Sequence, residues 1–486
     1  MHGRAQFISK FHNPKKKQLG KKEPEIINSV VIGDYAAEGR CVARVDGMVV
    51  FVEKAVPGDV ADVRIYSRKK NLCQGVAVRI VEPSALRVNP VCVHFGTCGG
   101  CKWQDLEYAS QTRFKQQQVA DSLARIGKVA VGEMRPILSA PDAYRYRNRL
   151  DYSFSANRWL TQDEVTSGVR YTAGGLGFHV PRRWDKVIDI SECHLQPEPG
   201  NSIRNRIREL ALKHEMTFWD PRAHTGFLRN LTLRNTLAGD WMLLLAVGED
   251  RPDDLALLLD DAVAEFPQLR SVQYVVNRKH NDTIHDLDVV VYHGDPHLTE
   301  TMDGLSFRIG PKSFFQTNGR QAHVLYEVAR TLAGLQSQHT VYDLYTGTGT
   351  IALYMANRCN KVMGIDYVKA AIDDAVINAQ LNGVTNTEFM AGDMKDVFTP
   401  DLIARFGSPD VVVTDPPRAG MDDRVVDRLI ECAPERIVYV SCNPATQARD
   451  LARLDLAYSV EVCQPVDMFP HTHHVENVVL LKRRDN

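Results

Sequence analysis

The chain has 486 residues, more than a single hydrophobic core usually supports, so two or three domains are expected. Hydrophobic residues make up 44% and charged residues 24% of the chain, as is typical of globular proteins. No apolar stretch approaches the roughly 20 residues that span a bilayer, and no apolar signal segment follows the basic N-terminus. We therefore expect a cytoplasmic protein with no membrane partner and no obligate protein partner. Its ten cysteines are not expected to form a disulfide framework.

The formal net charge of −1 is unevenly distributed along the chain. Residues 1–22 contain seven Lys and Arg residues and no acidic residue. Such segments are usually disordered, so we predict a basic disordered arm over residues 1–23. The arm could bind phosphate groups or could simply keep the terminus solvated, and charge alone does not distinguish these roles.

Residues 24–84 have the pattern of a small β-barrel. Strand-like runs occur at residues 30–32, 49–52, 60–65 and 75–81. Turn residues such as Asp46-Gly47 and Pro57-Gly58 separate them, which favours an OB-like barrel, a common platform for nucleic acids. An excess of Arg and Lys agrees with that role, although a purely structural barrel would show the same strand pattern.

A mixed α+β pattern extends over residues 85–310, which we predict to be a central domain. A cysteine cluster lies near its start, and a helix is predicted at roughly 107–127. Apolar strand-like runs such as Trp241–Val247 and Ser271–Val276 alternate with helical segments. The polar, Gly-containing stretch at 156–175 predicts a surface insertion.

From residue 311 to residue 486 the pattern changes to alternating strands and helices. Strands are predicted at 340–344, 361–365, 387–391, 411–415, 436–441, 457–466 and 476–482. This alternation predicts a mostly parallel, doubly wound α/β sheet.

A glycine-rich loop follows the first strand of that sheet. The sequence Asp343 to Thr350 contains Gly347 and Gly349, which allow a tight turn and close approach of a ligand to the backbone. Asp366 ends the second strand, where a carboxylate can accept hydrogen bonds from ribose hydroxyls. The motif by itself fits both NAD and S-adenosylmethionine. The acidic-aromatic start of the loop and the later Asp415-Pro416-Pro417-Arg418 sequence favour the methyl donor.

Two later strands end in residues that can perform chemistry. Arg436–Val440 leads into Ser441-Cys442-Asn443-Pro444, and Val411–Thr414 leads into Asp415. Because open α/β sheets build their sites at the carboxyl ends of strands, these residues and Glu476 are expected to meet. A thiol and a carboxylate in one cleft can add covalently to a ring and later remove a proton. The pairing suggests methylation of an unreactive pyrimidine carbon.

In this interpretation Cys442 is the nucleophile and Glu476 is the base. Addition of the Cys442 thiolate to C6 of uracil would make C5 enolate-like, so that C5 can attack an electrophilic methyl group. The pKa of this thiol would have to fall for rapid attack, and the helix N-terminus after Pro444 could help to lower it. Glu476, as a partly buried carboxylate, would then remove the proton from C5, and Asp415 is expected to lie between cofactor and base.

Taken together, these motifs resemble those of the RNA uracil-C5 methyltransferases. The matching segments, in that family's order, are residues 314–318, 343–349, 415–420, 441–444 and 474–476. Residues 24–84, with Tyr35-Ala36-Ala37-Glu38-Gly39, are similar to a TRAM domain, an RNA-binding barrel. Because of the barrel and the cysteine cluster, the layout is most similar to the bacterial 23S rRNA enzymes of the family. It is less similar to the tRNA enzyme, which lacks both features.

The resemblance implies a Rossmann-like class I methyltransferase domain, an N-terminal OB-like TRAM barrel and a central α+β domain. It implies S-adenosylmethionine as cofactor, held by Gln316, Tyr345, Asp366 and Asp415, and 5-methyluridine in 23S rRNA as product. Asp366 stands where the family often has Glu. Methylation of tRNA by the same chemistry remains an alternative, as does a non-catalytic RNA-binding or assembly factor. Phe314 and Phe315 are candidates for base stacking or for the core.

The cysteine cluster predicts a metal site. Cys92, Cys98 and Cys101 are closely spaced, with Gly99-Gly100 between the last two, but spacing does not distinguish zinc from iron–sulfur. The resemblance implies Cys193 as the fourth ligand and a [4Fe–4S] cluster with a structural or RNA-positioning role. The histidines of residues 471–474 could also bind zinc, but orientation of the loop that carries Glu476 is favoured.

Overall fold

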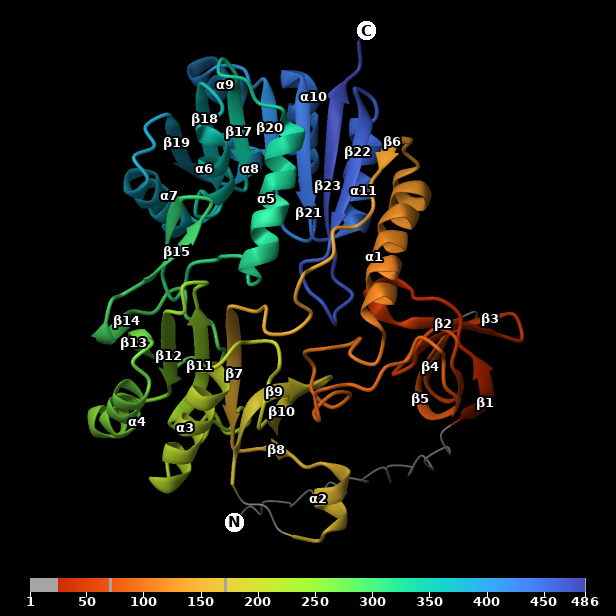
Figure 1. Ribbon diagram of the computed structural model, residues 1–486, viewed down its shortest axis with the longest axis vertical. Helices are drawn as coiled ribbons and strands as arrows, with labels where there is room; N and C mark the ends of the chain where they lie inside the picture. Colours follow the sequence, from red (N-terminus) through yellow and green to blue (C-terminus); the bar gives the residue numbers. More distant parts are fainter. Residues whose placement is uncertain (1–24, 70–71, 170–172, 486) are drawn as a thin grey trace, which may run out of the picture. The chain divides into compact units, whose positions relative to one another are not determined.

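The computed structural model describes residues 25–69, 72–169 and 173–485 (Figure 1). The described residues form two compact units. The first consists of residues 25–34 and 40–84, and the second consists of residues 35–39 and 85–485. The predicted basic arm at 1–23 lies outside the described residues. Within the described ranges, no helix is long and apolar enough to cross a membrane.

The first unit is a five-stranded barrel with the strand order β1-β4-β5-β3-β2. Its strands are β1 (Ile26–Val31), β2 (Cys41–Val45), β3 (Met48–Glu53), β4 (Val60–Lys69) and β5 (Leu72–Glu82). Backbone hydrogen bonds from Gly33 N to Val42 O (2.8 Å) and from Val42 N to Asp34 O (2.8 Å) join the two edges of the sheet. Side chains that alternate along the strands, such as Val50 and Val52, are fully buried inside it. The predicted OB-like barrel is confirmed.

The second unit begins with a helical segment. A 3₁₀ turn (Ala37–Gly39) belongs to this unit, and Gly39 O accepts a hydrogen bond from Trp103 Nε1 (3.4 Å). Helix α1 (Tyr108–Ser122) continues into a π-helical turn (Leu123–Gly127), as predicted for this stretch. Strand β6 (Val131–Met134) then pairs with the C-terminal sheet.

The central segment forms a second sheet, with the order β14-β13-β12-β11-β7-β9-β10-β8. Its strands are β7 (Arg149–Ser155), β8 (Arg158–Trp159), β9 (Gly175–Val180), β10 (Arg183–Asp189), β11 (Leu228–Asn235), β12 (Trp241–Val247), β13 (Leu269–Val276) and β14 (Val289–Gly294). Helices α3 (Gly200–Lys213) and α4 (Pro252–Glu265) pack their apolar faces against it, and the short helix α2 (Gln162–Thr166) lies in the predicted insertion. In Figure 1, α3 and α4 lie beside β11 and β12.

The C-terminal segment is a three-layer α/β domain with the strand order β19-β18-β17-β20-β21-β23-β22, extended by β6. The strands are β17 (Thr340–Leu344), β18 (Lys361–Asp366), β19 (Thr387–Ala391), β20 (Val411–Thr414), β21 (Arg436–Ser441), β22 (Tyr458–Val466) and β23 (Glu476–Arg483). The first five are parallel, whereas β23 is antiparallel to both of its neighbours. This is the doubly wound sheet that the sequence predicted.

Helices cover both faces of this sheet because its strands are apolar on both sides. One face packs against α5 (Gly319–Ala333), α6 (Thr350–Ala356) and α7 (Lys369–Leu381), together with the hairpin β15 (Leu298–Met302) and β16 (Leu305–Ile309). The other face packs against α1, α8 (Met394–Val397), α9 (Pro400–Phe406), α10 (Asp423–Cys432) and α11 (Pro444–Leu454).

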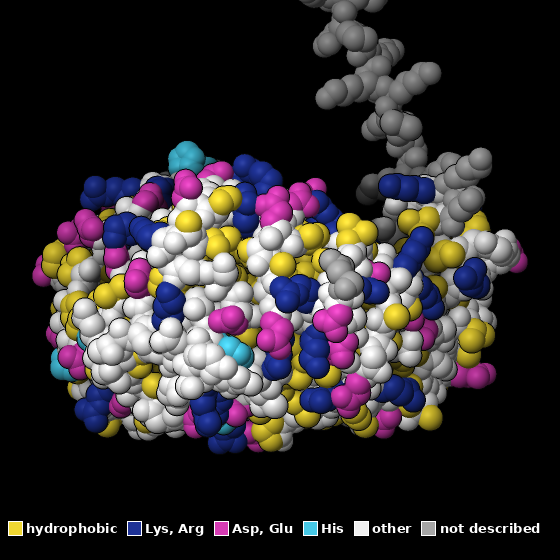
Figure 2. Space-filling view, turned by 90° about the horizontal axis from the view of Figure 1, so that it is seen from above, with side chains coloured by type: hydrophobic (Ala, Val, Ile, Leu, Met, Phe, Trp, Pro, Cys, Tyr) yellow, Lys and Arg dark blue, Asp and Glu magenta, His cyan; other side chains and the backbone are white. Residues whose placement is uncertain are grey.

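Charges are mixed over one face of the molecule. On the face drawn in Figure 2, Lys and Arg side chains are interspersed with Asp and Glu side chains rather than gathered into areas of one sign. This agrees with the formal net charge of −1.

Candidate active site

The carboxyl ends of the parallel strands β17, β18, β20 and β21 meet at one edge of the C-terminal sheet, and the antiparallel strand β23 begins there. Ser441 pairs with Asn477 across β21 and β23, so the adjacent residues Cys442 and Glu476 lie side by side at this edge. Asp415 follows β20, and its amide donates a hydrogen bond to Leu344 O (3.2 Å). The structure therefore brings Cys442, Glu476 and Asp415 together.

Local sequence fixes the position of Cys442. It stands between the buried strand β21 and helix α11, whose N-cap residue Asn443 accepts a hydrogen bond from the Ala445 amide (3.1 Å). Asn443 Nδ2 and Thr446 Oγ1 both donate to Arg418 O (3.0 and 3.1 Å), which ties the Asp415–Arg418 loop to the start of α11. A proline at the first helical position and an Asn cap are favoured in this role.

The thiol of Cys442 is less acidic than the sequence led us to expect. Burial first, and then the neighbouring carboxyls of Glu476 and Asp415, raise its pKa to about 11. Arg418 lowers the pKa of the thiol by charge and by a hydrogen bond, but it does not outweigh burial. In the ligand-free site the pKa of this thiol is therefore raised rather than lowered, first by burial and then by the two acidic groups beside the sulfur.

Glu476 and Asp415 form a buried acidic pair. The Glu476 side chain is only 4% exposed, and burial raises its pKa, with Asp415 adding to the rise and Arg418 opposing it. Burial likewise raises the pKa of Asp415. Two carboxyls in one buried site favour sharing a proton, because ionising both costs desolvation and repulsion. A carboxylate whose pKa is raised in this way is suited to accept a proton near neutral pH.

The glycine-rich loop has the geometry of a ligand cradle. Gly347 (φ +56°) and Gly349 (φ +80°) both have left-handed backbone conformations, and a side chain at Gly347 would meet nothing within 4 Å. Asp366 fixes the loop: its carboxylate accepts hydrogen bonds from Gly347 N (2.9 Å) and Val368 N (2.8 Å). Tyr345, at φ 67°, is partly buried beside this loop.

Asp343 is a candidate site residue that the sequence reasoning did not single out. It is fully buried, its Oδ2 accepts a hydrogen bond from Thr346 Oγ1 (2.5 Å), and its Oδ1 has no partner within the described residues. Burial and then Asp415 raise its pKa to about 7 despite Thr346. A cationic ligand would offset this cost, which fits the sulfonium and ammonium groups of S-adenosylmethionine. The position of Asp343 at the start of the loop motif was the sequence signal that could have identified it.

The remaining predicted residues lie in the segment before α5. Gln316 is 9% exposed, and its backbone oxygen accepts a hydrogen bond from Asn148 Nδ2 (3.0 Å). Phe315 is in the core and cannot stack on a base, whereas Phe314 is 72% exposed. In α5, the buried Tyr326 has its pKa raised by burial first and then by the nearby carboxyls of the active site.

A buttress formed by the N-terminal part of the second unit holds the loop that leads to Glu476. The amides of Lys102 and Trp103 both donate to His471 O (2.9 and 3.1 Å), and Gln111 Oε1 accepts from His471 N (2.8 Å). Lys115 and Asp467 form a fully buried ion pair (2.6 Å). No sequence signal identified this arrangement, since the partners are more than 300 residues apart.

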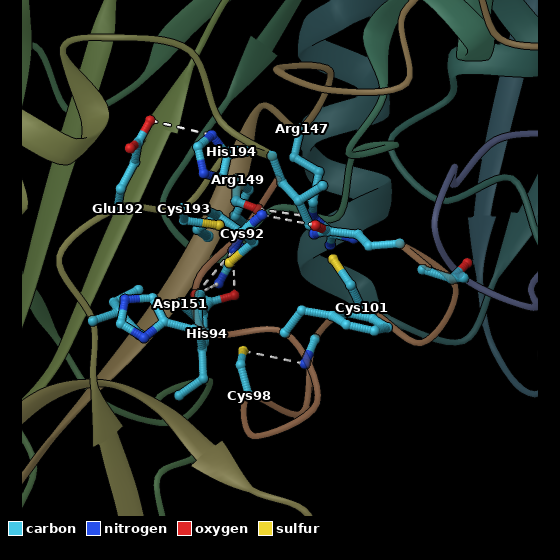
Figure 3. A pocket seen from close by; sticks show the side chains of 18 residues that line it. Cys92, His94, Cys98, Cys101, Arg147, Arg149, Asp151, Glu192, Cys193 and His194 are labelled. Atoms are coloured by element: carbon cyan, nitrogen blue, oxygen red, sulfur yellow. Dashed lines mark hydrogen bonds and ion pairs between the residues drawn. The ribbon is translucent and has the colours of Figure 1, made fainter. Parts of the chain in front are cut away.

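The four predicted cysteine ligands line one pocket of about 270 Å³ (Figure 3). Burial raises the pKa of Cys98 to about 11 and of Cys101 to about 12, and the neighbouring thiols add to both shifts. Burial also raises the pKa values of Cys92 and Cys193. A buried group of thiols with these mutual effects is a donor set that a cationic metal centre would stabilise.

Hydrogen bonds bring the two parts of this pocket together. Ser191 N donates to His94 Nε2 (3.1 Å), which joins the Cys92–Cys101 loop to the segment of Cys193. Cys193 N donates to Asn201 Oδ1 (2.8 Å). The pocket also reaches Thr472, in the loop that leads to Glu476, so the cysteines are close to that loop although they are far from Cys442 in sequence.

Among the described residues, no three His, Cys, Asp or Glu side chains are placed close enough together to hold one metal ion. The spacing and burial of the four thiols therefore leave zinc and iron–sulfur both open at this pocket.

Burial also keeps the histidines of the catalytic loop neutral. It lowers the pKa of His471 to about 4, of His473 to about 3 and of His474 to about 4. The His471 backbone is anchored by the buttress, and its Nδ1 lies 3.2 Å from Gln111 Nε2. These contacts agree with a role in loop orientation.

Comparisons with known proteins point to one family. A sequence model of the tRNA (Uracil-5-)-methyltransferase family matches residues 295–484, and a TRAM domain model matches residues 29–78. The chain is 50% identical to an uncharacterized RNA methyltransferase of Bacteroides thetaiotaomicron, over 92% of this chain and all of the relative. It is 38% identical to one of Chlorobaculum tepidum, over 98% of this chain and all of that relative.

A solved structure is similar along nearly the whole chain. It is the Pyrococcus abyssi tRNA (uracil-54, C5)-methyltransferase in complex with S-adenosyl-L-homocysteine, with 30% identity and a TM-score of 0.72. The match covers 93% of this chain and all of the Pyrococcus chain, so it extends into the barrel. The expectation that a barrel separates rRNA enzymes from tRNA enzymes was therefore wrong.

The chain belongs to the RNA uracil-C5 methyltransferase family. It is an S-adenosylmethionine-dependent RNA methyltransferase with an N-terminal TRAM domain and a class I methyltransferase fold.

Proposed function

We propose that this enzyme methylates C5 of a specific uridine in 23S rRNA through a covalent bond between Cys442 and C6. The observation that supports the chemistry best is the pairing of β21 with β23, which sets Cys442 beside Glu476. Choice of the ribosomal target rests on the resemblance to the bacterial 23S rRNA enzymes that the cysteine cluster carries, since the barrel does not separate these enzymes from a tRNA enzyme. Such a substrate places the enzyme in the cytoplasm.

Cys442, Glu476 and Arg418 each have a defined part in this mechanism. The Cys442 thiolate forms a bond to C6, and the electron pair of the C5–C6 double bond moves into an enolate at C4. S-adenosylmethionine, when bound, supplies the electrophilic methyl group that C5 attacks. Glu476 then accepts the proton from C5, and the released electron pair restores the double bond and expels the thiolate. Arg418, which lowers the pKa of the Cys442 thiol, would stabilise the thiolate.

Four residues are proposed to hold the cofactor. Asp366, fixed by two backbone amides, would accept hydrogen bonds from the ribose hydroxyls. Tyr345, Gln316 and Asp415 complete the set that the family resemblance implies. The open space beside Gly347 and the unpartnered Oδ1 of Asp343 support binding of the donor here.

Trapping of the covalent adduct tests the two catalytic roles. The Glu476→Gln variant should accumulate a protein–RNA adduct that survives denaturing electrophoresis, because the C5 proton is no longer removed. The Cys442→Ala variant should form none, whereas Cys432→Ala, at a partly buried cysteine of α10, should turn over normally. Equal adduct from the Glu476 and Cys442 variants would contradict the assigned roles.

Transfer of a labelled methyl group to total RNA tests the target. Label in 23S rRNA, lost with Cys442→Ala, supports the proposal. Methylation of tRNA is the second candidate, favoured by the similarity to the Pyrococcus tRNA enzyme along 93% of this chain. Label in tRNA alone would overturn the ribosomal target. No label in any RNA would favour a non-catalytic RNA-binding or assembly factor.

The cysteine pocket is proposed to hold a [4Fe–4S] cluster through Cys92, Cys98, Cys101 and Cys193. The four thiols around one pocket support a metal centre, and the family resemblance favours the iron–sulfur cluster over zinc. The cluster would position the catalytic loop or the RNA. Protein purified without oxygen should be brown and contain about four irons per chain. Colourless protein with stoichiometric zinc would reject the cluster.

A further inference from the structure

A second hollow lies in the central sheet, at the ends of β7 and β11 that are furthest from the methyltransferase segment. It has a volume of about 790 Å³, within the range of ligand sites in proteins. Asn148, just before β7, donates hydrogen bonds to the segment before α5, whereas Ser153 at the other end of this strand lines the hollow. At about 3.3 Å per residue, Ser153 is roughly 15 Å from Asn148.

The floor of the hollow is a buried guanidinium. Arg229 is 1% exposed and stacks on Trp219, with 3.9 Å from Cζ to the ring centroid. Its Nη atoms donate to Asn277 O (2.7 Å) and Lys279 O (2.6 Å), among other acceptors, so that the group is held rigidly. Its Nε–H has no partner within the described residues, and neither has the buried Oδ1 of the adjacent Asn230.

These two atoms are a donor and an acceptor on residues that line the same hollow. Both atoms are buried, so a ligand in the hollow would meet the polar and aromatic side chains around them rather than the atoms themselves. A ligand with both hydrogen-bonding edges and an apolar face suits such a lining. Nucleobases have both properties.

The walls offer flat surfaces of the kind on which bases stack. The rings of His224 and His280 are parallel, with centroids 4.0 Å apart and 9° between their planes. Trp184 on β10 is 65% exposed, which is unusual for so large an apolar side chain. Exposed aromatic and imidazole faces are the common platform for unpaired bases in RNA-binding proteins.

The rim carries one exposed guanidinium that can reach the backbone of the same ligand, and the lining also includes the carboxylate of Asp282, which pairs with Arg229 (2.9 Å). Arg222 lines the hollow and is exposed, and it forms an ion pair with the buried Asp185. The loop that bears it is ordered by hydrogen bonds from the amides of Arg222 (2.8 Å) and Ala223 (3.2 Å) to Asp220 Oδ1. Guanidinium groups at exposed positions bind phosphate oxygens well.

We propose that this hollow binds an unpaired base of the RNA substrate, several nucleotides from the uridine that is methylated. The base would stack on Trp184 or the His224–His280 pair, and Arg222 would contact its phosphate. The inference rests on the proposed function, because it requires a folded RNA that spans both the active site and the central sheet. The site would then help to select the RNA, since an RNA without an unpaired base at this distance would bind less tightly.

Two substitutions test the proposal without disturbing the floor. Trp184→Ala and His280→Ala remove stacking surfaces from exposed positions, whereas His224 is avoided because its φ of 55° tolerates few residues. His293→Ala, at an exposed histidine on β14 of the same sheet, is the matched control. Thermal unfolding of all three should match the wild type.

The expected result is a specific loss of affinity for long RNA. Loss of one stacked base should raise the Kd for an rRNA fragment about 5- to 150-fold. Methylation of a short RNA that contains only the target uridine and its neighbours should be unchanged, as should all properties of His293→Ala. Ultraviolet crosslinks between the long RNA and the wild-type protein should map to the peptides of Trp184 and His280.

Three outcomes would overturn the proposal. One is wild-type affinity of both variants for the long RNA, and another is an equal loss on the short RNA. The third is binding of free uridine monophosphate or adenosine monophosphate in the hollow, combined with variants whose affinity for RNA is unchanged. Since affinity is measured without methyl transfer, failure of the proposed function would appear separately, as absence of methylation by the wild type.

Discussion

The buried ion pair between Lys115 and Asp467 is predicted to hold the catalytic loop in place. Both side chains are 0% exposed, and Nζ lies 2.6 Å from Oδ1. Lys115 Nζ also donates to Phe469 O (3.0 Å), and Asp467 Oδ2 accepts from Tyr108 OH (2.9 Å). The pair therefore joins α1 to the start of the loop that leads to Glu476.

Removal of one partner should be far more damaging than removal of both. Lys115→Met leaves the Asp467 carboxylate buried with only Tyr108 OH and Phe469 N as donors, which should destabilise the loop by about 3–5 kcal/mol. Lys115→Met combined with Asp467→Asn removes both charges and should recover most of this loss. The exposed pair Lys369–Asp373 (2.7 Å) is the control, and Lys369→Met should change stability by less than about 0.5 kcal/mol.

Hydrogen exchange measures this effect at the loop itself. A loss of 3–5 kcal/mol should speed exchange of the amides in residues 467–476 roughly 100- to 5,000-fold in the single variant. The kcat should fall in parallel, because Glu476 loses its fixed position. Amide exchange at the wild-type rate in Lys115→Met would refute the reasoning. So would a double variant whose amides exchange faster than those of Lys115→Met.

Three further predictions concern the active site. Arg418→Gln should shift the pH dependence of kcat/KM to higher pH, because Arg418 lowers the pKa values of both the Cys442 thiol and the Glu476 carboxyl, and a pH profile that does not move would contradict this. Glu476→Gln should raise the thermal midpoint at pH 8, by the equivalent of about 1 kcal/mol or more, and not at pH 4. The pKa of the Glu476 carboxyl is raised in the folded wild type, so the wild type loses stability as the pH rises from the unfolded pKa to the folded pKa. An equal gain in thermal midpoint at both pH values would argue against a buried charge. Gly347→Ala should weaken binding of S-adenosylhomocysteine while costing the fold only about 1–2 kcal/mol of backbone strain, since a Cβ there meets no protein atom. Gly349→Ala should also destabilise the fold, because its Cβ would lie 2.9 Å from Ala375 Cβ. Titration calorimetry measures the loss of ligand affinity, and scanning calorimetry measures the loss of stability.

The motifs were predictable because they depend on local sequence. A buried strand followed by Pro444 fixes the position of Cys442, and the glycines of the cofactor loop meet their backbone requirement locally. The order of strands and helices gave the doubly wound sheet, and the turn spacing gave the barrel. Each of these signals is confined to one element and its flanking residues.

The strength of the nucleophile was not predictable in the same way. The sequence places a helix N-terminus after Cys442, which by itself would lower the pKa of the thiol. Only the folded chain shows that burial, and then Glu476 and Asp415, raise the pKa of this thiol instead. Likewise, Phe314 and Phe315 are indistinguishable in sequence, and packing alone makes one exposed and the other part of the core.

The sequence by itself determined the elements and the glycine-rich loop, and it supplied the residues proposed as reactive groups, because those depend on residues that are neighbours along the chain. Tertiary structure decided the Lys115–Asp467 buttress, the approach of the cysteine pocket to the catalytic loop, and the hollow around Arg229. These features join residues tens to hundreds of positions apart. Burial and electrostatic neighbours act through space, so their effects on charge and reactivity exist only once the chain has folded.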